Sequence, residues 1–200
     1  MKINRLALRL CMCALVLLRA LSLYADGKDS LSRKMIHMAG IDVKPAYVFP
    51  THEFFAGNNA TFSPIRKNLS VHLKYGFKFA PDTYFGRMYP HAVQGIGVGY
   101  NTFFHSSELG NPWSVYAFQT SRIASLTPRL SLDYEWNFGA SFGWKKYDAE
   151  SNPYNRVVGS KMNAYIHLSF LLNWQLDAQT NLRAGIGATH FSNGNTAYPN

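Results

Sequence analysis

The sequence predicts an all-β fold, an antiparallel transmembrane β-barrel of eight strands of which this chain holds seven. Three observations support it: apolar and polar residues alternate along several segments, these segments run to about ten residues or more, and the links between them alternate in length. A soluble two-sheet sandwich would alternate too, but its strands usually have about five or six residues. A tilted strand needs roughly ten residues to cross a bilayer, so segment length favours the barrel.

The composition is that of a single domain in which much of the surface is buried or covered by lipid. Of the 200 residues, 47% are hydrophobic, 15% aromatic and only 16% charged, which excludes the disordered class. The formal net charge is +9, or +5 without the four basic residues of the segment 1–25, and this mildly basic balance suits an anionic surface such as a membrane without requiring nucleic acid as a partner.

Residues 1–25 have the layout of a secretory signal peptide. A basic start precedes an apolar run over 10–18, and the small residue Ala25 stands before Asp26. This run is too short for a spanning helix. Both cysteines, Cys11 and Cys13, fall inside the segment, so the exported chain would form no disulfide. Export to the bacterial outer membrane is the expected localisation.

The rest of the chain divides into an N-terminal periplasmic segment at 26–40 and the barrel at 41–200. A short helix is expected within 28–40. The seven expected strands cover about 41–56, 68–79, 92–104, 113–125, 130–146, 161–176 and 181–192.

The alternation assigns side chains to the two faces of each strand. Within 130–138 the apolar residues are expected to face lipid and the polar ones the lumen, where Asp133 and Glu135 could pair with a cation such as Lys74. The outward set is Leu130, Leu132, Tyr134, Trp136 and Phe138, and the inward set adds Asn137. Seven glycines are also expected inward: Gly95, Gly97, Gly99, Gly139, Gly143, Gly185 and Gly187.

The connections are expected to be short at 126–129 and 177–180 and long at 57–68, 105–112 and 147–160, as in barrels with short periplasmic turns. The long link 80–91 does not fit this scheme. An odd number of strands leaves an unpaired edge, which is costly in hydrocarbon, so a last strand is expected beyond residue 200.

A histidine and a serine close the last predicted strand, in the stretch Thr189-His190-Phe191-Ser192-Asn193-Gly194. Residues two apart on a strand point to the same side, so His190 and Ser192 could form a nucleophile and base pair. They share their face with apolar Ile186 and Leu182, and in a barrel that face looks toward lipid. A bare His-x-Ser also occurs often by chance, as ordinary polar residues at the rim.

This stretch resembles the motif of the outer-membrane lipid A 3-O-deacylases, the acyloxyacyl hydrolase-like family. The segments 109–112 and 128–137 also look like the branch of that family found in Bacteroides-type bacteria, and the resemblance spans about 41–200. It implies that His190 is the general base and Ser192 the nucleophile, with Asn193 and Gly194 as oxyanion candidates. The family's third member, a glutamate on the following strand, would lie beyond residue 200.

The reaction implied is hydrolysis of an ester-linked acyl chain of lipid A in lipopolysaccharide, with no metal and no cofactor. The motif is also similar to that of outer-membrane phospholipase A, a larger calcium-dependent barrel. A barrel that only binds lipid, without catalysis, is the third interpretation.

The basic residues of the long links are candidates for holding the phosphates of the lipid A head group, or else are ordinary solvated charges. They are Arg66, Lys67, Lys145, Lys146, Arg156 and Lys161. The acidic loop residues are expected to be solvated, and the remaining histidines, which lack metal-ligand spacing, to be polar residues of lumen or loops.

Overall fold

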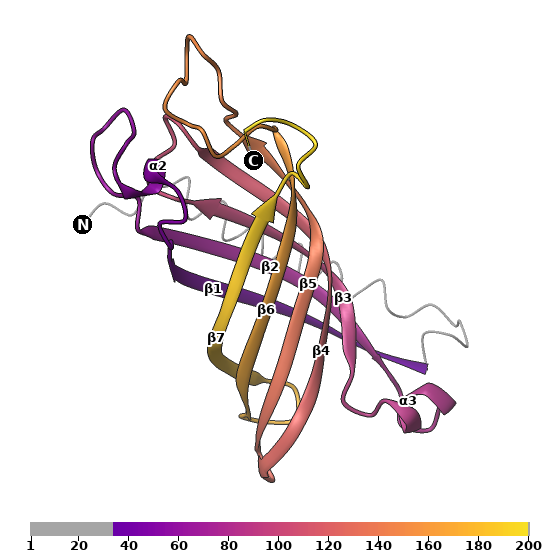
Figure 1. Cartoon of the computed structure of the whole chain (residues 1–200). Helices are drawn as coiled ribbons and strands as arrows, with labels where there is room; N and C mark the ends of the chain where they lie inside the picture. Colours follow the sequence, from indigo (N-terminus) through magenta and orange to yellow (C-terminus); the bar gives the residue numbers. More distant parts are fainter. Residues whose placement is uncertain (1–33, 200) are drawn as a thin grey trace, which may run out of the picture.

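The computed structural model describes residues 34–199, which form one antiparallel sheet of seven strands, curled into a half-barrel (Figure 1). The strands follow one another in chain order, and each pairs with the next. They are β1 (Met35–Tyr47), β2 (Lys67–Phe79), β3 (Val93–Thr102), β4 (Gly110–Thr127), β5 (Leu130–Trp144), β6 (Met162–Gln175) and β7 (Asn181–Ser192), with helix α2 (Glu53–Ala56) after β1 and α3 (Tyr84–Met88) after β2.

The all-β class and the seven strands are therefore confirmed, and β1 and β7 are the two edges of the sheet. The segment expected to be a signal peptide lies outside the described residues, as do residues 26–33. Within 34–199, no helix is long and apolar enough to cross a membrane.

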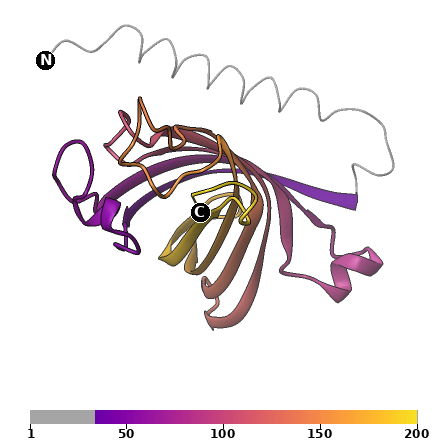
Figure 2. The same ribbon diagram turned by 45° about the horizontal axis from the view of Figure 1, so that its top comes forward.

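The connections differ between the two ends of the sheet. The loops 48–66, 103–109 and 145–161 gather at one end together with 193–199, and we call this the loop end. At the other, the turn end, the links 128–129 and 176–180 are short, as predicted, while 80–92 is longer and contains α3. Figure 2 shows the curl of the sheet, with α3 standing away from its wall.

The two faces of the sheet have opposite chemistry. On the concave inner face, Asp133, Glu135 and Asn137 are at most 5% exposed, whereas Trp136 and Phe138 on the convex outer face are 40% and 59% exposed. The predicted inward and outward assignment of this strand is confirmed. The inner face carries many buried polar side chains, which include Ser70, His72, Lys74, Asn101, Ser114, Thr120, His167 and Ser169.

Besides a cluster of Tyr116, Phe118 and Tyr165 farther along the inner face, the interior holds a larger apolar cluster at the loop end. Phe54, Leu109 and Trp144 are buried there, together with Ile65, Phe103 and Val158. Trp144 turns inward because Gly143 adopts φ +87°, a conformation that L-residues rarely adopt, and so breaks the alternation of β5. Gly143 is thus an exposed irregularity in the strand rather than the inward glycine that was predicted.

Two expected boundaries are wrong. Residues 35–40, expected as part of a periplasmic segment with a short helix, belong to β1, because their backbone pairs with the end of β2 from Met35 opposite Phe79 to Gly40 opposite Lys74. The expected strand 41–56 ends at Tyr47, and Glu53–Ala56 forms α2, whose first turn is capped by the His52 ring accepting the Phe54 N–H at 3.1 Å.

Candidate functional site

The end of β7 presents its side chains alternately to the interior and to the outside. Thr189 and Phe191 face inward: the Thr189 hydroxyl lies 2.8 Å from Nδ1 of His167, and the Phe191 ring packs 4.9 Å from that of Trp144. His190 and Ser192 therefore face outward, as predicted. Thr189 and Phe191, which flank His190, anchor the strand from its inner side.

His190 and Ser192 share a face, but the part of the chain that the structure describes contains no hydrogen bond between them. His190 is exposed and stands opposite Ile166 of β6. The Ser192 hydroxyl accepts the Gly194 N–H at 3.0 Å. The imidazole would have to turn toward this hydroxyl before it could take its proton.

Asn193 organises the loop that follows β7. Its Nδ2 donates to the carbonyl oxygens of Ala197 at 2.7 Å and Pro199 at 3.2 Å, and its Oδ1 accepts the Asn195 N–H at 2.9 Å. Both hydrogens of this amide are thus engaged within the loop. In this conformation Asn193 has no free donor for an oxyanion.

The six basic candidates lie at the loop end, the same end as His190 and Ser192. Two of them have hydrogen bonds with loop carbonyls: Arg66 donates to Phe55 O at 2.8 Å, and Lys145 donates to Ser107 O at 3.0 Å. Four are exposed outside these contacts, Lys67, Lys146, Arg156 and Lys161. The topology brings the basic residues and the His-x-Ser stretch to one end, as the sequence predicted.

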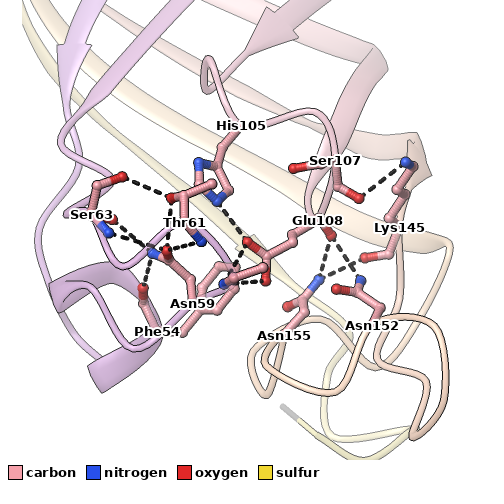
Figure 3. A network of polar contacts seen from close by, with 11 residues as sticks. Phe54, Asn59, Thr61, Ser63, His105, Ser107, Glu108, Lys145, Asn152 and Asn155 are labelled. Atoms are coloured by element: carbon pink, nitrogen blue, oxygen red, sulfur yellow. Dashed lines mark hydrogen bonds and ion pairs between the residues drawn. The ribbon is translucent and has the colours of Figure 1, made fainter.

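The three long loops of that end are held together by one buried glutamate, Glu108 (Figure 3). Its carboxylate accepts the Ala60 N–H at 3.2 Å and lies 2.7 Å from Nε2 of His105. Its backbone oxygen accepts from Asn152 at 3.0 Å and Asn155 at 2.7 Å. The expectation that acidic loop residues are solvated is wrong for Glu108, which is only 4% exposed.

The loop 145–161 has a local acidic turn as well. The Asp148 carboxylate accepts the N–H groups of Ser151 at 2.8 Å and Glu150 at 3.2 Å, and these bonds lower the pKa of Asp148. Asp148 is thus a turn-forming residue, and the nearby charge of Lys146 also contributes to its lowered pKa.

The interior contains a charged network that links both edges of the sheet. Lys74 of β2 pairs with Asp42 of β1 and with Glu135 of β5, which confirms the predicted pairing of Lys74 with an inward acid. Arg183 of β7 reaches the same two carboxylates, Asp42 at 3.4 Å and Glu135 at 3.3 Å. β1 and β7 do not pair through their backbones, but their side chains meet through these ions.

A second serine and histidine pair, which the sequence reasoning missed, lies inside. The Ser70 hydroxyl is 2.9 Å from Nε2 of His72, and Nδ1 of the same ring is 3.0 Å from the Tyr116 hydroxyl. Ser70 and His72 have the same two-residue spacing on a regular strand, which was the available signal. All three side chains are at most 5% exposed, so this array is a buried structural network without access for a substrate.

Among residues 34–199, no group of three or more His, Cys, Asp or Glu side chains could hold a metal ion. No family model, curated protein or solved structure matches the chain.

Proposed function

We propose that the chain forms a β-barrel in the bacterial outer membrane. The support is the inverted pattern of the sheet, with ionic groups inside and large apolar groups outside, because soluble monomers rarely expose a contiguous apolar face of this extent. The outward residues of the strands include Val71, Leu73, Ile96, Val98, Val115, Phe138, Ile166, Leu168, Phe170, Leu172 and Ile186, all at least 42% exposed.

We further propose that this barrel is an esterase that removes an ester-linked acyl chain from lipid A. The observation that carries the proposal is the placement of His190 and Ser192 on the apolar outer face, at the end where the basic loop residues gather. A lipid A molecule in the outer leaflet would set its phosphates against the basic loops and its acyl esters against the barrel wall. The ester could then reach Ser192 without entering water.

In the proposed reaction, His190 takes the proton of Ser192, and the serine oxygen attacks the ester carbonyl to form an acyl-enzyme. The alcohol leaves with the proton held by His190, and a water molecule then releases the fatty acid and restores the serine. The backbone N–H of Gly194, which points at the Ser192 hydroxyl, and Asn193 are the candidate donors for the oxyanion. Asn193 would first have to release Ala197 and Pro199.

The experiment is an assay of fatty-acid release by the purified full chain on lipopolysaccharide and on phosphatidylethanolamine, with and without chelator. Release from lipopolysaccharide in chelator supports the deacylase, whereas calcium-dependent release from the phospholipid supports the phospholipase A-like alternative. Ser192→Ala and His190→Ala should each abolish release. Ser70→Ala, which changes the other serine beside a histidine, is the matched control and should retain it.

A lipid-binding barrel without catalysis is the second candidate. It is favoured by the hydrogen bonds of the motif, since Asn193 and Ser192 have partners within their own loop and no bond joins Ser192 to His190. If neither the unmodified chain nor Ser192→Ala releases fatty acid, the non-enzymatic function takes precedence, whereas equal release by both would show that Ser192 is not the nucleophile.

The head-group part of the proposal has its own test. Replacing Lys145, Lys146 and Arg156 together with glutamine removes three positive charges from the loop end, and should raise KM on lipopolysaccharide at low salt with little change in kcat. Salt screens such contacts over about 10 Å at 0.1 M, so the difference should shrink as salt is added. An unchanged KM at low salt would show that these are only solvated charges.

A further inference from the structure

Helix α3 and the residue that follows it expose large apolar side chains. Tyr84, Phe85, Met88 and Tyr89 are each between 52% and 64% exposed, although a helix of a globular protein normally buries such residues. Figure 2 shows α3 standing out from the wall of the sheet. An exposed cluster of this kind marks a binding surface.

The position of α3 is fixed by its other side. The Thr83 hydroxyl donates to Ala80 O at 2.7 Å and accepts the Gly86 N–H at 3.0 Å, which caps the helix. Gly86 approaches Ala80 so closely that a Cβ would overlap the Ala80 carbonyl. Arg87 adds a bond to Asp82 O at 2.7 Å. The backbone around α3 is therefore built to hold the helix against the end of β2 while its apolar residues point outward.

The apolar surface of α3 continues the outer face of the sheet. The Phe77 and Phe79 rings of β2 lie 5.9 Å apart, and Phe79 lies 5.3 Å from Phe85 of α3. A hollow of about 480 Å³ opens beside Phe79 and Phe85; its lining also includes Met35, Thr83 and Tyr84 and the two charged residues Lys34 and Asp82. Aromatic rings next to charged groups suit the boundary between acyl chains and polar head groups.

We propose that α3 is an interfacial anchor that inserts its aromatic and methionine side chains into the phospholipid leaflet at the turn end, opposite the leaflet that faces the proposed esterase pair. The inference rests on the proposed membrane barrel. An anchoring role for α3 accounts for the length of the link 80–92, because a simple turn between two strands would need fewer residues. A lipid occupant is favoured over a protein partner because the aromatic contacts run unbroken from the barrel wall to the helix.

The test measures depth with nitroxide spin labels in vesicles of phosphatidylethanolamine and phosphatidylglycerol. The full chain with Cys11→Ser and Cys13→Ser is labelled at one introduced cysteine: Met88→Cys on α3, Leu168→Cys on the wall, or Gln179→Cys in the polar turn of the same end. For each label we measure the collision rate with oxygen, which is enriched in lipid, and divide it by the collision rate with a water-soluble nickel complex. We expect this ratio to be several-fold higher at Met88 than at Gln179, and highest at Leu168.

The wall label separates two kinds of failure. If Leu168 reports lipid and Met88 reports water, the anchor is wrong while the barrel stands, and α3 would then face the aqueous phase or a protein. If Leu168 itself reports water, the membrane barrel fails and the anchor with it. A second label at Tyr89, another exposed position, should give the same reading as Met88, and disagreement between the two would also overturn the anchor.

Discussion

Replacing Glu108 with alanine should release the loop 48–66 from the rest of the loop end. The carboxylate holds the Ala60 N–H at 3.2 Å and the His105 ring at 2.7 Å, and hydrogen bonds to a charged group are worth about 1.5–3 kcal/mol each. Loss of the acceptor should therefore speed hydrogen exchange of the Ala60 amide by about 10- to 100-fold, since each factor of ten corresponds to about 1.4 kcal/mol.

Amide exchange read by mass spectrometry or NMR on the folded chain would measure this. Glu108→Gln keeps an acceptor but loses the charge, so its effect should be intermediate. Glu150→Ala removes an exposed glutamate from another loop of the same end and is the matched control. Asn152 and Asn155 bind the backbone oxygen of Glu108, so their loop should stay protected in all three variants. Equal exchange at Ala60 in Glu108→Ala and Glu150→Ala would refute the reasoning.

Two further predictions concern the interior. Gly97→Ala places a Cβ where it overlaps the Tyr116 ring and should lower the free energy of unfolding by about 1–3 kcal/mol in urea titration, whereas Gly40→Ala, whose Cβ would have its nearest neighbour at 3.7 Å, should be close to neutral. Phe191→Ala removes the half-buried ring 4.9 Å from Trp144 and should cost about 3 kcal/mol, seen as a lower unfolding midpoint with unchanged β-sheet circular dichroism; an unchanged midpoint would mean that this ring does not anchor β7.

The strands were predictable where alternation is unbroken. In β2, β5 and β6 nearly every outward residue is large and apolar and nearly every inward one polar, so local pattern alone sets the strand and its orientation, and β7 was predicted at its observed bounds, 181–192. The start of β1 was missed because Met35 to Gly40 lack such a pattern. These residues are extended because the end of β2, more than 30 residues away, offers them a backbone to pair with.

The loop end was least predictable, for a related reason. In the sequence Glu108 and His105 are ordinary polar residues of a short loop, and their burial depends on Ala60 and Asn155, which come from the two other loops. Side-chain partners that are brought together by three separate connections leave no local signal. The inward position of Arg183, in contrast, followed from the phase of β7, although its partner Asp42 at the opposite edge did not.

The hydrogen bond between Gly194 and Ser192 is compatible with the proposed nucleophile. A serine hydroxyl accepts through its lone pairs and donates through its own hydrogen, so accepting the Gly194 N–H at 3.0 Å leaves the Ser192 proton free for a base. The exposed His190 ring, held by no hydrogen bond that the structure records, has only to rotate about its side-chain bonds to receive it. The backbone between them is fixed from the other side by Phe191, so the pair can reorganise without disturbing the sheet.

The step that the conformation opposes is oxyanion binding by Asn193, because its amide must first give up two carbonyl partners. If the chain is an esterase, Asn193→Ala should therefore reduce turnover far less than Ser192→Ala does, and an equal loss in both variants would show that the loop 193–199 opens before the reaction.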